Sequence, residues 1–298
     1  MSVADATRSL CDQAVRLDLP PEARARVQTA RARLDGPLRV AIAGRVKAGK
    51  STLLNALVGE RLAPTDAGEC TRIVSWYREG LGYGVTAELL DGETQTLDFR
   101  RNGELRIELG ELTPEQVRRL LVDWPSERLS ATTLIDTPGL ASLDTTVSER
   151  TRDALAASGH GAPDADAVVY LMRHLHRVDA DFLEGFVTGS DVGASPVNSI
   201  AVLSRADEIG AGRLDAMQSA RSVAAAYERD GQVTALSSRV VAVAGLVAET
   251  AQTLTEAEFR AVQRLASLPL VDALLLSVDR FVDHDPDGSV SALSLIHI

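Results

Sequence analysis

The sequence predicts an α/β domain with a mainly parallel β-sheet that is covered by helices on both faces. Continuous apolar runs rich in Val, Ile and Ala alternate along the chain with segments of helical periodicity. Strands of this kind are buried on both faces, and their alternation with helices is typical of parallel sheets. Hydrophobic residues make up 45% of the 298 residues, enough for one large domain or two smaller ones.

The first 36 residues predict a helical arm. Apolar positions recur at helical spacing from residue 3 to residue 34, and Pro20-Pro21 divides them into two helices. Gly36-Pro37 ends the segment. Because the arm is amphipathic, we expect it to pack against a partner surface.

Residues 37–268 predict the α/β domain itself. The strands that we expect are 38–43, 73–77, 132–135, 167–172, 199–203 and 240–243, with a hairpin over 85–99 that turns at Asp91-Gly92. The expected helices are 52–58, 146–157, 179–187, 213–229 and 256–266. Another helix is expected from Thr113 to Trp124, because Thr113, Pro114 and Gln116 form a helix-start pattern.

The C-terminal part predicts a last helix over residues 269–282. The final six residues, 293–298, resemble the translation of a sequencing-library adaptor, with a short natural apolar tail as the alternative. We therefore expect the natural protein to continue beyond residue 292.

The most informative motif follows the first buried strand and opens a helix. It has the spacing Gly-x-x-x-x-Gly-Lys-Ser, whose backbone amides and helix N-terminus bind the phosphates of a nucleotide. Its lysine would reach the β- and γ-phosphates, and its serine hydroxyl would ligate Mg²⁺. We expect phosphate contacts from Gly44, Ala48, Gly49, Lys50, Ser51 and Thr52.

Two downstream segments fit switches that sense the γ-phosphate. Thr71 lies in a polar loop, where a threonine can ligate Mg²⁺ and touch the γ-phosphate; a turn or capping threonine is the other interpretation. Asp136-Thr137-Pro138-Gly139 follows a buried strand. There Asp136 would hold Mg²⁺ through water, and the Gly139 amide would sense the γ-phosphate.

A third segment predicts recognition of guanine. Asp207 follows the strand ending at Leu203, and one carboxylate can accept from both the N1–H and the 2-amino group of guanine, donors that adenine lacks. Arg205 could lie along the base. Ala244 and Gly245 follow the last strand, where a backbone amide could meet guanine O6. The expected ligand is GTP with Mg²⁺.

With these motifs in place, residues 37–282 resemble the GTPase domain of bacterial dynamin-like proteins, within them the actinobacterial isoniazid-inducible group. The resemblance lies in residues 44–80, 135–139 and 203–210. It implies a large GTPase with a helical neck, to which residues 1–36 and 269–292 would contribute. It also implies membrane remodelling, pairing with a second copy or another dynamin-like protein, and peripheral membrane contact through a missing C-terminal region.

One departure from the family pattern concerns catalysis. Dynamins commonly carry a polar pair, which orients water and holds a monovalent cation, where this chain has Val46 and Lys47. Lys47 would either neutralise charge in the transition state or point to solvent. The expected catalytic residues are Lys47, Lys50, Thr71 and Gly139, and the expected Mg²⁺ ligands are Ser51, Thr71 and Asp136.

The composition of the chain limits which partners and which cellular location we expect. A net charge of −11 argues against nonspecific nucleic-acid binding, and two cysteines make no disulfide framework, which is typical of the cytoplasm. No stretch approaches the about 20 apolar residues of a spanning helix, so we expect peripheral contact at the inner face of the cell membrane. Two other classes remain open: a soluble regulatory GTPase of RNA or ribosomes, and a nonhydrolysing module that docks in its GTP-bound state.

Overall fold

The computed structural model describes residues 2–63, 72–101, 105–139, 164–174, 179–180, 183–184, 196–210 and 215–267. The helices expected at 146–157 and 269–282, and most of the helix expected at 179–187, lie outside these ranges. So do Thr71 and the six residues that resemble an adaptor.

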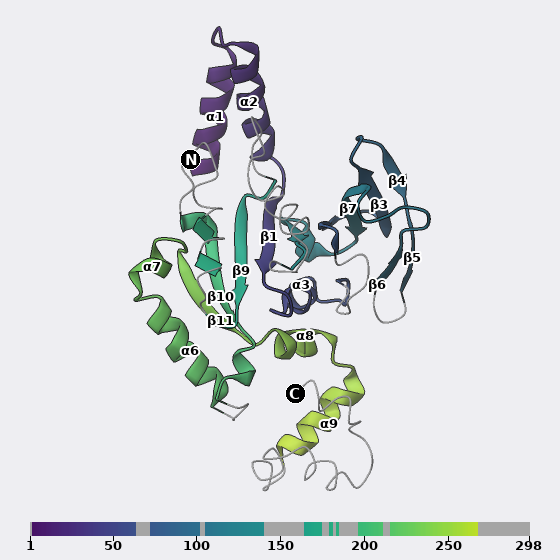
Figure 1. The fold of residues 1–298 in the computed structure, drawn as a ribbon, viewed down its shortest axis with the longest axis vertical. Coiled ribbons are helices and arrows are strands. Elements are labelled where there is room, and N and C mark those ends of the chain that lie inside the picture. Colours follow the sequence, from purple (N-terminus) through teal and green to yellow (C-terminus); the bar gives the residue numbers. More distant parts are fainter. Residues whose placement is uncertain are drawn as a thin grey trace.

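A nine-stranded mixed sheet forms the body of the molecule, in the order β11-β10-β9-β1-β8-β2-β7-β3-β4 (Figure 1). Neighbouring strands are parallel except in three pairs, β2–β8, β3–β7 and β3–β4. The strands predicted at 38–43, 132–135, 167–172, 199–203 and 240–243 form one parallel set, which confirms the expected mainly parallel sheet. The strands are β1 Leu38–Gly44, β2 Ser75–Glu79, β3 Gly84–Leu89, β4 Thr94–Thr96, β7 Val117–Trp124, β8 Thr132–Asp136, β9 Ala167–Met172, β10 Ser199–Ser204 and β11 Arg239–Val243.

Helices cover both faces of the sheet, as the apolar strands predict. Within β1, Ala41 and Ala43 are buried in a core that includes Ala220 and Ala224 of α6 (Ala216–Tyr227). Ile42, between them, is buried in a second core with residues of α3 (Lys50–Val58). Successive side chains of a strand point to opposite faces. The middle of β1 is therefore apolar on successive residues, because its side chains supply two cores.

The helix expected from Thr113 to Trp124 is wrong, because Val117–Trp124 forms β7. The helix-start pattern does act locally: the Thr113 amide donates to Gln116 Oε1 at 2.9 Å, and the chain turns once. Beyond that turn Leu120, Val122 and Trp124 alternate inward in β7. Pairing with β2 on one side and β3 on the other satisfies the β7 backbone, so tertiary contacts override the capping signal.

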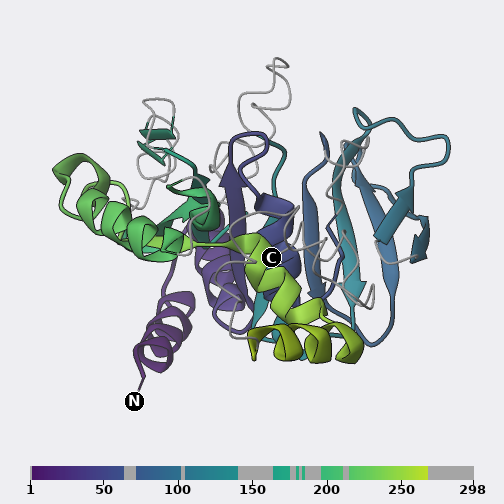
Figure 2. The same ribbon diagram turned by 90° about the horizontal axis from the view of Figure 1, so that it is seen from below.

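Several elements were not predicted. A small hairpin of β5 (Asp98–Arg101) and β6 (Leu105–Glu108) lies beside the antiparallel end of the sheet. Helix α8 (Gly245–Thr253) packs against α3. The helix predicted at 256–266 is present as α9 (Glu256–Ala266) and follows α8, as Figure 2 shows from below. A short helix α7 (Gly231–Thr234) precedes β11.

The N-terminal arm is a helical hairpin, α1 (Val3–Val15) and α2 (Pro21–Arg33), as predicted. It projects beyond the end of the sheet at which β1 begins (Figure 1). Ion pairs join the two helices and the turn after them, Arg31 to Asp12 at 2.9 Å and Arg8 to Asp35 at 2.9 Å. Neither helix buries a residue within the described part of the chain.

Candidate functional site

The phosphate-binding loop joins the end of β1 to the start of α3. Gly44 lies so close to β9 that a Cβ would stand 2.4 Å from the Leu171 carbonyl oxygen, so only glycine fits there. Gly49 caps α3 with φ 92°, a left-handed conformation that favours glycine. The free amides of the first turn of α3 therefore face the loop, and helix N-termini of this kind bind anions.

Lys50 opens α3 and folds back over the loop. Its Nζ donates to the carbonyl oxygens of Gly44 and Arg45, each at 3.3 Å. Burial lowers the pKa of Lys50, and the nearby Asp136 carboxylate opposes that effect. A phosphate anion beside the ammonium would favour its charged form, which fits the role predicted for this side chain.

Ser51 and Asp136 meet beside Lys50, on different elements. Ser51 Oγ lies 3.4 Å from Asp136 Oδ2, and Asp136 ends β8, the direct neighbour of β1. Asp136 Oδ1 is buried and has no hydrogen-bond partner, and burial raises the pKa of Asp136 to about 6. An unpartnered carboxylate oxygen next to a serine hydroxyl suits Mg²⁺, which prefers oxygen ligands. The residues present therefore fit the metal that the motif implies.

Gly139 lies directly against the phosphate-binding loop. A Cβ at Gly139 would stand 2.6 Å from Val46 Cγ2 and 3.0 Å from Val46 Cα, so this close approach requires glycine. Thr137 anchors the same turn on β1, because its hydroxyl donates to the Ile42 carbonyl oxygen at 2.9 Å. The turn that carries Gly139 is thus held beside the loop, with the half-exposed, apolar Val46 between them.

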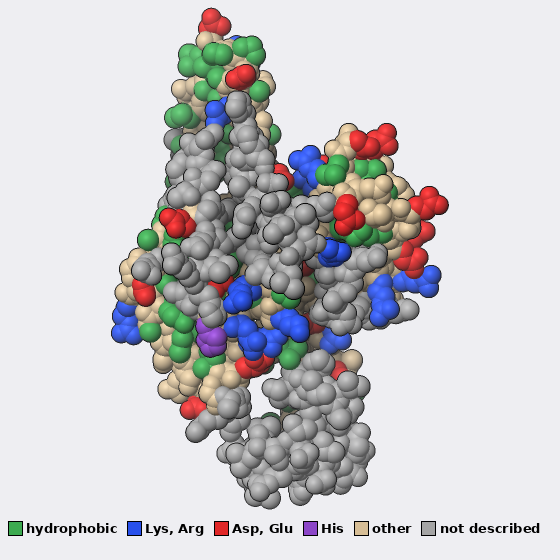
Figure 3. Space-filling view, in the orientation of Figure 1, with side chains coloured by type: hydrophobic (Ala, Val, Ile, Leu, Met, Phe, Trp, Pro, Cys, Tyr) green, Lys and Arg blue, Asp and Glu red, His purple; other side chains and the backbone are tan. Residues whose placement is uncertain are grey.

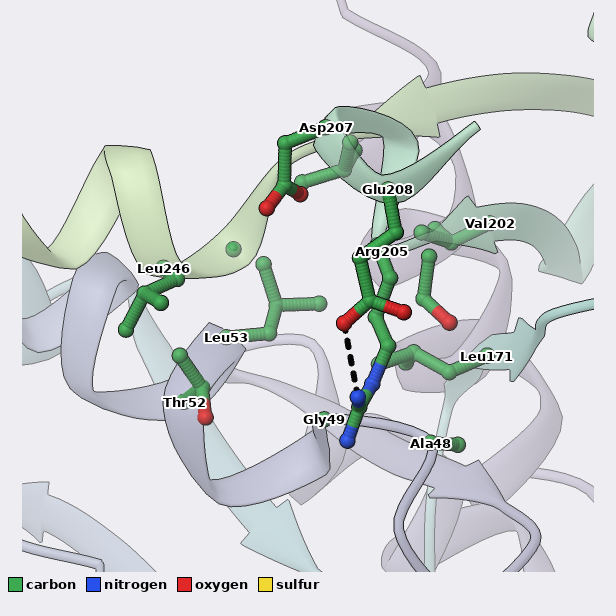
Figure 4. A pocket seen from close by; sticks show the side chains of 13 residues that line it. Ala48, Gly49, Thr52, Leu53, Leu171, Val202, Arg205, Asp207, Glu208 and Leu246 are labelled. Carbon is green, nitrogen blue, oxygen red and sulfur yellow. Dashed lines mark hydrogen bonds and ion pairs between the residues drawn. The ribbon is translucent and has the colours of Figure 1, made fainter. Parts of the chain in front are cut away.

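A cavity of about 260 Å³ opens beside the loop, between α3, the end of β10 and the start of α8. Figure 4 shows the Asp207 carboxylate directed into it, with Leu53 and Leu246 on the apolar side. Gly245 begins α8 close to α3. A Cβ added at Gly245 would stand 3.7 Å from Thr52 Cγ2. The cavity therefore joins residues of the phosphate-binding loop to the predicted guanine-binding residues.

Arg205 connects the two halves of the site in a way that the sequence did not predict. Its Nη2 donates to the Lys47 carbonyl oxygen at 3.1 Å, and its Nη1 pairs with Glu208 at 2.7 Å (Figure 4). The other carboxylate oxygen of Glu208 accepts from Arg173 at 2.6 Å. Figure 3 shows a group of Lys and Arg side chains near the centre of one face of the molecule. The Lys47 side chain is exposed, in agreement with either interpretation of its role.

Among the described residues, the structure brings the predicted site residues to the same end of the sheet, except that Ala244 is buried in the core with Ala41 and Ala43 and does not line the cavity. Thr71 lies outside the described ranges. In those ranges, no cluster of three or more His, Cys, Asp and Glu side chains could hold another metal ion. Nor does any helix there combine the length and apolar character needed to cross a bilayer. Asn55, which is buried on α3, belongs to a segment that carries the family resemblance but was not among the predicted site residues; its amide side chain between apolar neighbours was the available signal.

Comparisons with known proteins identify the relatives of this chain. The family model described as the Dynamin family matches residues 40–187. Isoniazid-induced protein IniC of Mycobacterium tuberculosis is 46% identical over 265 residues, which cover 88% of this chain and 53% of the relative. Bacterial dynamin-like protein of Nostoc punctiforme is 44% identical over 66 residues, 22% of this chain and 10% of that protein. The chain spans about half the length of the IniC relatives.

Solved structures support the fold. Two structures of an oligomerised bacterial dynamin pair match with TM-scores of 0.50 and 0.54 at 17% identity. Both matches cover 91% of this chain, and they cover 42% and 41% of the two dynamin chains. The phosphate-binding loop, the order of the site segments, the family model and the IniC relatives all agree, and the chain belongs to the dynamin family of GTPases, with the fold of its GTPase domain.

Proposed function

We propose that this protein binds GTP with Mg²⁺ and hydrolyses it to GDP and phosphate. The observation that carries the proposal is that Lys50, Ser51 and Asp136 meet at the phosphate-binding loop. Ala48, Gly49 and Thr52 of the same loop line a cavity into which Asp207 points. One end of the site offers a cation and Mg²⁺ ligands for a triphosphate, and the other offers a carboxylate for guanine. An adenine base has no donors for that carboxylate to accept from.

Each residue has a part in the proposed reaction. Lys50 binds the β- and γ-phosphates, Ser51 and Thr71 ligate Mg²⁺, and Asp136 holds the ion through water. When bound, Mg²⁺ neutralises charge that develops on the phosphates. The Gly139 amide donates to the γ-phosphate, and the attacking nucleophile is water. The protein contributes mainly positioning and charge neutralisation.

Lys47 supplies the remaining charge in this proposal. Val46 lies against Gly139 and offers no polar group to orient water or to hold a monovalent cation. Lys47 follows it and carries an exposed ammonium at the edge of the loop. We place that ammonium in the role that the cation has in other dynamins, so turnover should depend little on the choice between Na⁺ and K⁺.

We further propose that GTP binding drives pairing with a second copy or another dynamin-like protein, and that the full-length protein remodels membranes. The support is the family membership and the fold shared with the oligomerised bacterial dynamin pair, whose description concerns the sensing and tethering of membranes. The site of action would be the inner face of the cell membrane, reached by peripheral contact through a C-terminal region.

Two measurements test the proposal. Calorimetry should show binding of GTP and GDP with a preference of at least about 100-fold over ATP and ADP. GTP turnover is then measured with and without anionic liposomes, and with added ribosomes or RNA. Stimulation by liposomes supports the membrane role, whereas stimulation only by RNA or ribosomes favours a soluble regulatory GTPase. Binding without any turnover favours a nonhydrolysing docking module.

A further inference from the structure

Helices α3 and α8 both start beside the cavity, and each has nine residues. Gly245 and Leu246 begin α8 and line the cavity, and Figure 4 shows Leu246 on the same side of it as Thr52. A Cβ added at Gly245 would touch α3, at 3.8 Å from the Leu53 amide nitrogen. The position of α8 relative to α3 therefore decides where one wall of the cavity lies.

Arg128 bridges the other ends of the same two helices. It lies on the short helix η2 (Glu127–Leu129), and its Nη2 donates to Gln252 Oε1 of α8 at 2.7 Å. Its Nη1 donates to the carbonyl oxygens of Ala56 and Leu57 at 3.4 and 3.5 Å. Carbonyl groups in the last turn of a helix lack partners within the helix, and a cation there also complements the helix dipole. One guanidinium therefore holds the end of α8 to the end of α3.

Gly59 makes room for this guanidinium. It ends α3 in a left-handed conformation with φ 83°, which favours glycine. A Cβ at Gly59 would stand 3.1 Å from Arg128 Nη1 and 3.2 Å from Arg128 Cζ. The turn that closes α3 thus also allows Arg128 to pack against the end of the helix.

A buried carboxylate makes a second bridge between the two helices. Glu249 of α8 is 5% exposed, and its Oε1 lies 3.2 Å from Nε of Arg61, which follows α3 in the chain. Gly245, Glu249 and Gln252 stand at i, i+4 and i+7, so they share one face of α8. That face is turned to α3 and to the residues just after it, from the start of α8 to its last turn.

These bridges lie away from the cavity but fix the helix that forms its wall. A helix of nine residues is about 13 Å long, so a tilt or slide of its far end displaces its first residues. Asp207 is carried by a different element, η4 (Ala206–Glu208), which follows β10. A change in the position of α8 should therefore alter contacts of the base with Gly245 and leave its contacts with Asp207 in place.

We propose that Arg128 and Glu249 are positioning residues for the base: they hold α8 along α3 so that the Gly245 amide meets O6 of guanine. No side chain caps the first turn of α8, which leaves its amides to a ligand. Asp207 reads the N1–H and the 2-amino group of the same base. The inference rests on the proposed function, since it assigns residues to the same site.

The test uses three nucleotides that differ only in the base: GDP, 6-thio-GDP and inosine diphosphate, each with Mg²⁺. Sulfur accepts hydrogen bonds less well than oxygen, so the preference for GDP over 6-thio-GDP reports the contact with O6. Inosine lacks the 2-amino group, so the preference for GDP over inosine diphosphate reports the contact with Asp207. Calorimetry on the whole chain measures the three dissociation constants.

The unsubstituted chain should bind GDP about five- to tenfold more tightly than 6-thio-GDP. Arg128→Met keeps the apolar stem, and Glu249→Gln keeps the volume of the side chain. Each should reduce this preference to about twofold or less, because the Gly245 amide is no longer held at O6. The preference for GDP over inosine diphosphate should stay unchanged. A purely structural role would weaken all three nucleotides equally and leave both preferences as they are.

Arg118→Met is the matched control, because Arg118 is another exposed arginine that pairs with a carboxylate. Its partner is Glu88, at 3.5 Å, in the antiparallel part of the sheet. Both preferences should stay those of the unsubstituted chain in this control. An unchanged preference over 6-thio-GDP in whichever of the two test variants folds, or an equal fall in both preferences, overturns the inference. If the unsubstituted chain binds no guanine nucleotide, the proposed function fails instead.

Discussion

Arg205 donates a hydrogen bond to the backbone carbonyl oxygen of Lys47, and both residues have left-handed backbone conformations, with φ of 53° and 63°. Non-glycine residues seldom adopt this conformation, and it persists where surrounding contacts hold it. The bond joins the predicted guanine-binding segment to the phosphate-binding loop across 158 positions of sequence. It is a direct contact between the two parts of the proposed nucleotide site.

Replacing Arg205 by methionine should therefore speed nucleotide release. Arg205→Met keeps the apolar stem and removes both the bond to Lys47 and the pair with Glu208. Because the guanidinium is partly exposed, we expect only a modest effect, about a three- to tenfold faster release of a fluorescent GDP analogue. Stopped-flow fluorescence measures that rate. Arg173→Met is the control, since Arg173 pairs with Glu208 without contacting Lys47; equal rates in both variants would argue against the Lys47 contact.

Asp207→Asn should change which base the site accepts. An amide offers one acceptor and one donor, so it no longer accepts from both N1–H and the 2-amino group of guanine. We expect GTP affinity to fall about 100-fold, and xanthosine triphosphate, which carries a 2-oxo group, to bind better than GTP. Competition calorimetry checks this order. Glu208→Gln removes the neighbouring charge and should leave the preference for guanine intact; retained guanine preference in Asp207→Asn would place base recognition elsewhere.

Asp136 should make the nucleotide-free protein less stable as the pH rises. Burial raises the pKa of Asp136 from 3.8 to about 6, so the folded state keeps a proton that the unfolded state has lost. The free energy of unfolding should therefore decrease between about pH 4 and pH 6, by up to about 3 kcal/mol relative to Asp136→Asn. Denaturant titrations of both proteins in EDTA measure this difference.

For Asp166 we expect the opposite dependence of the free energy of unfolding on pH. Burial raises its pKa, but hydrogen bonds from Arg39 outweigh that effect and lower the pKa overall. Asp166 therefore stabilises the fold at neutral pH, and that contribution is lost as the pH falls below the usual carboxyl range. Asp166→Asn is thus a control of opposite sign. A pH-independent difference between the unsubstituted chain and Asp136→Asn would contradict the effect of burial on Asp136.

Lys47→Ala should lower GTP turnover while leaving nucleotide affinity nearly intact. The Lys47 carbonyl oxygen that binds Arg205 remains in this variant, and only the exposed ammonium is lost. If that ammonium neutralises transition-state charge, turnover should fall about tenfold or more. Steady-state phosphate release measures turnover, and Lys47→Arg, which keeps the charge, should retain more of it. Unchanged turnover in Lys47→Ala would mean that the Lys47 side chain points to solvent and takes no part in catalysis.

Much of the fold could be predicted because many strands and helices show their pattern of apolar and polar residues within a short stretch of sequence. Strand β9 appears at the predicted residues, since a strand buried on both faces is a continuous apolar run. The region 113–124 could not be assigned in the same way. Its capping pattern and its alternating apolar residues indicate different structures, and the pairing of β7 with β2 and β3 decided between them.

By itself, the sequence determined the type of ligand site: residues 44–52 are contiguous, and a strand, a loop and a helix N-terminus suffice to make an anion site. It also determined the order in which Asp136, Asp207 and Gly245 follow along the chain. Only the tertiary structure decided that Arg205 binds the Lys47 backbone and that Asn55 holds Leu62 and Ala63. Such contacts depend on strand order and on the path of the chain between elements, which no local pattern of residue types records.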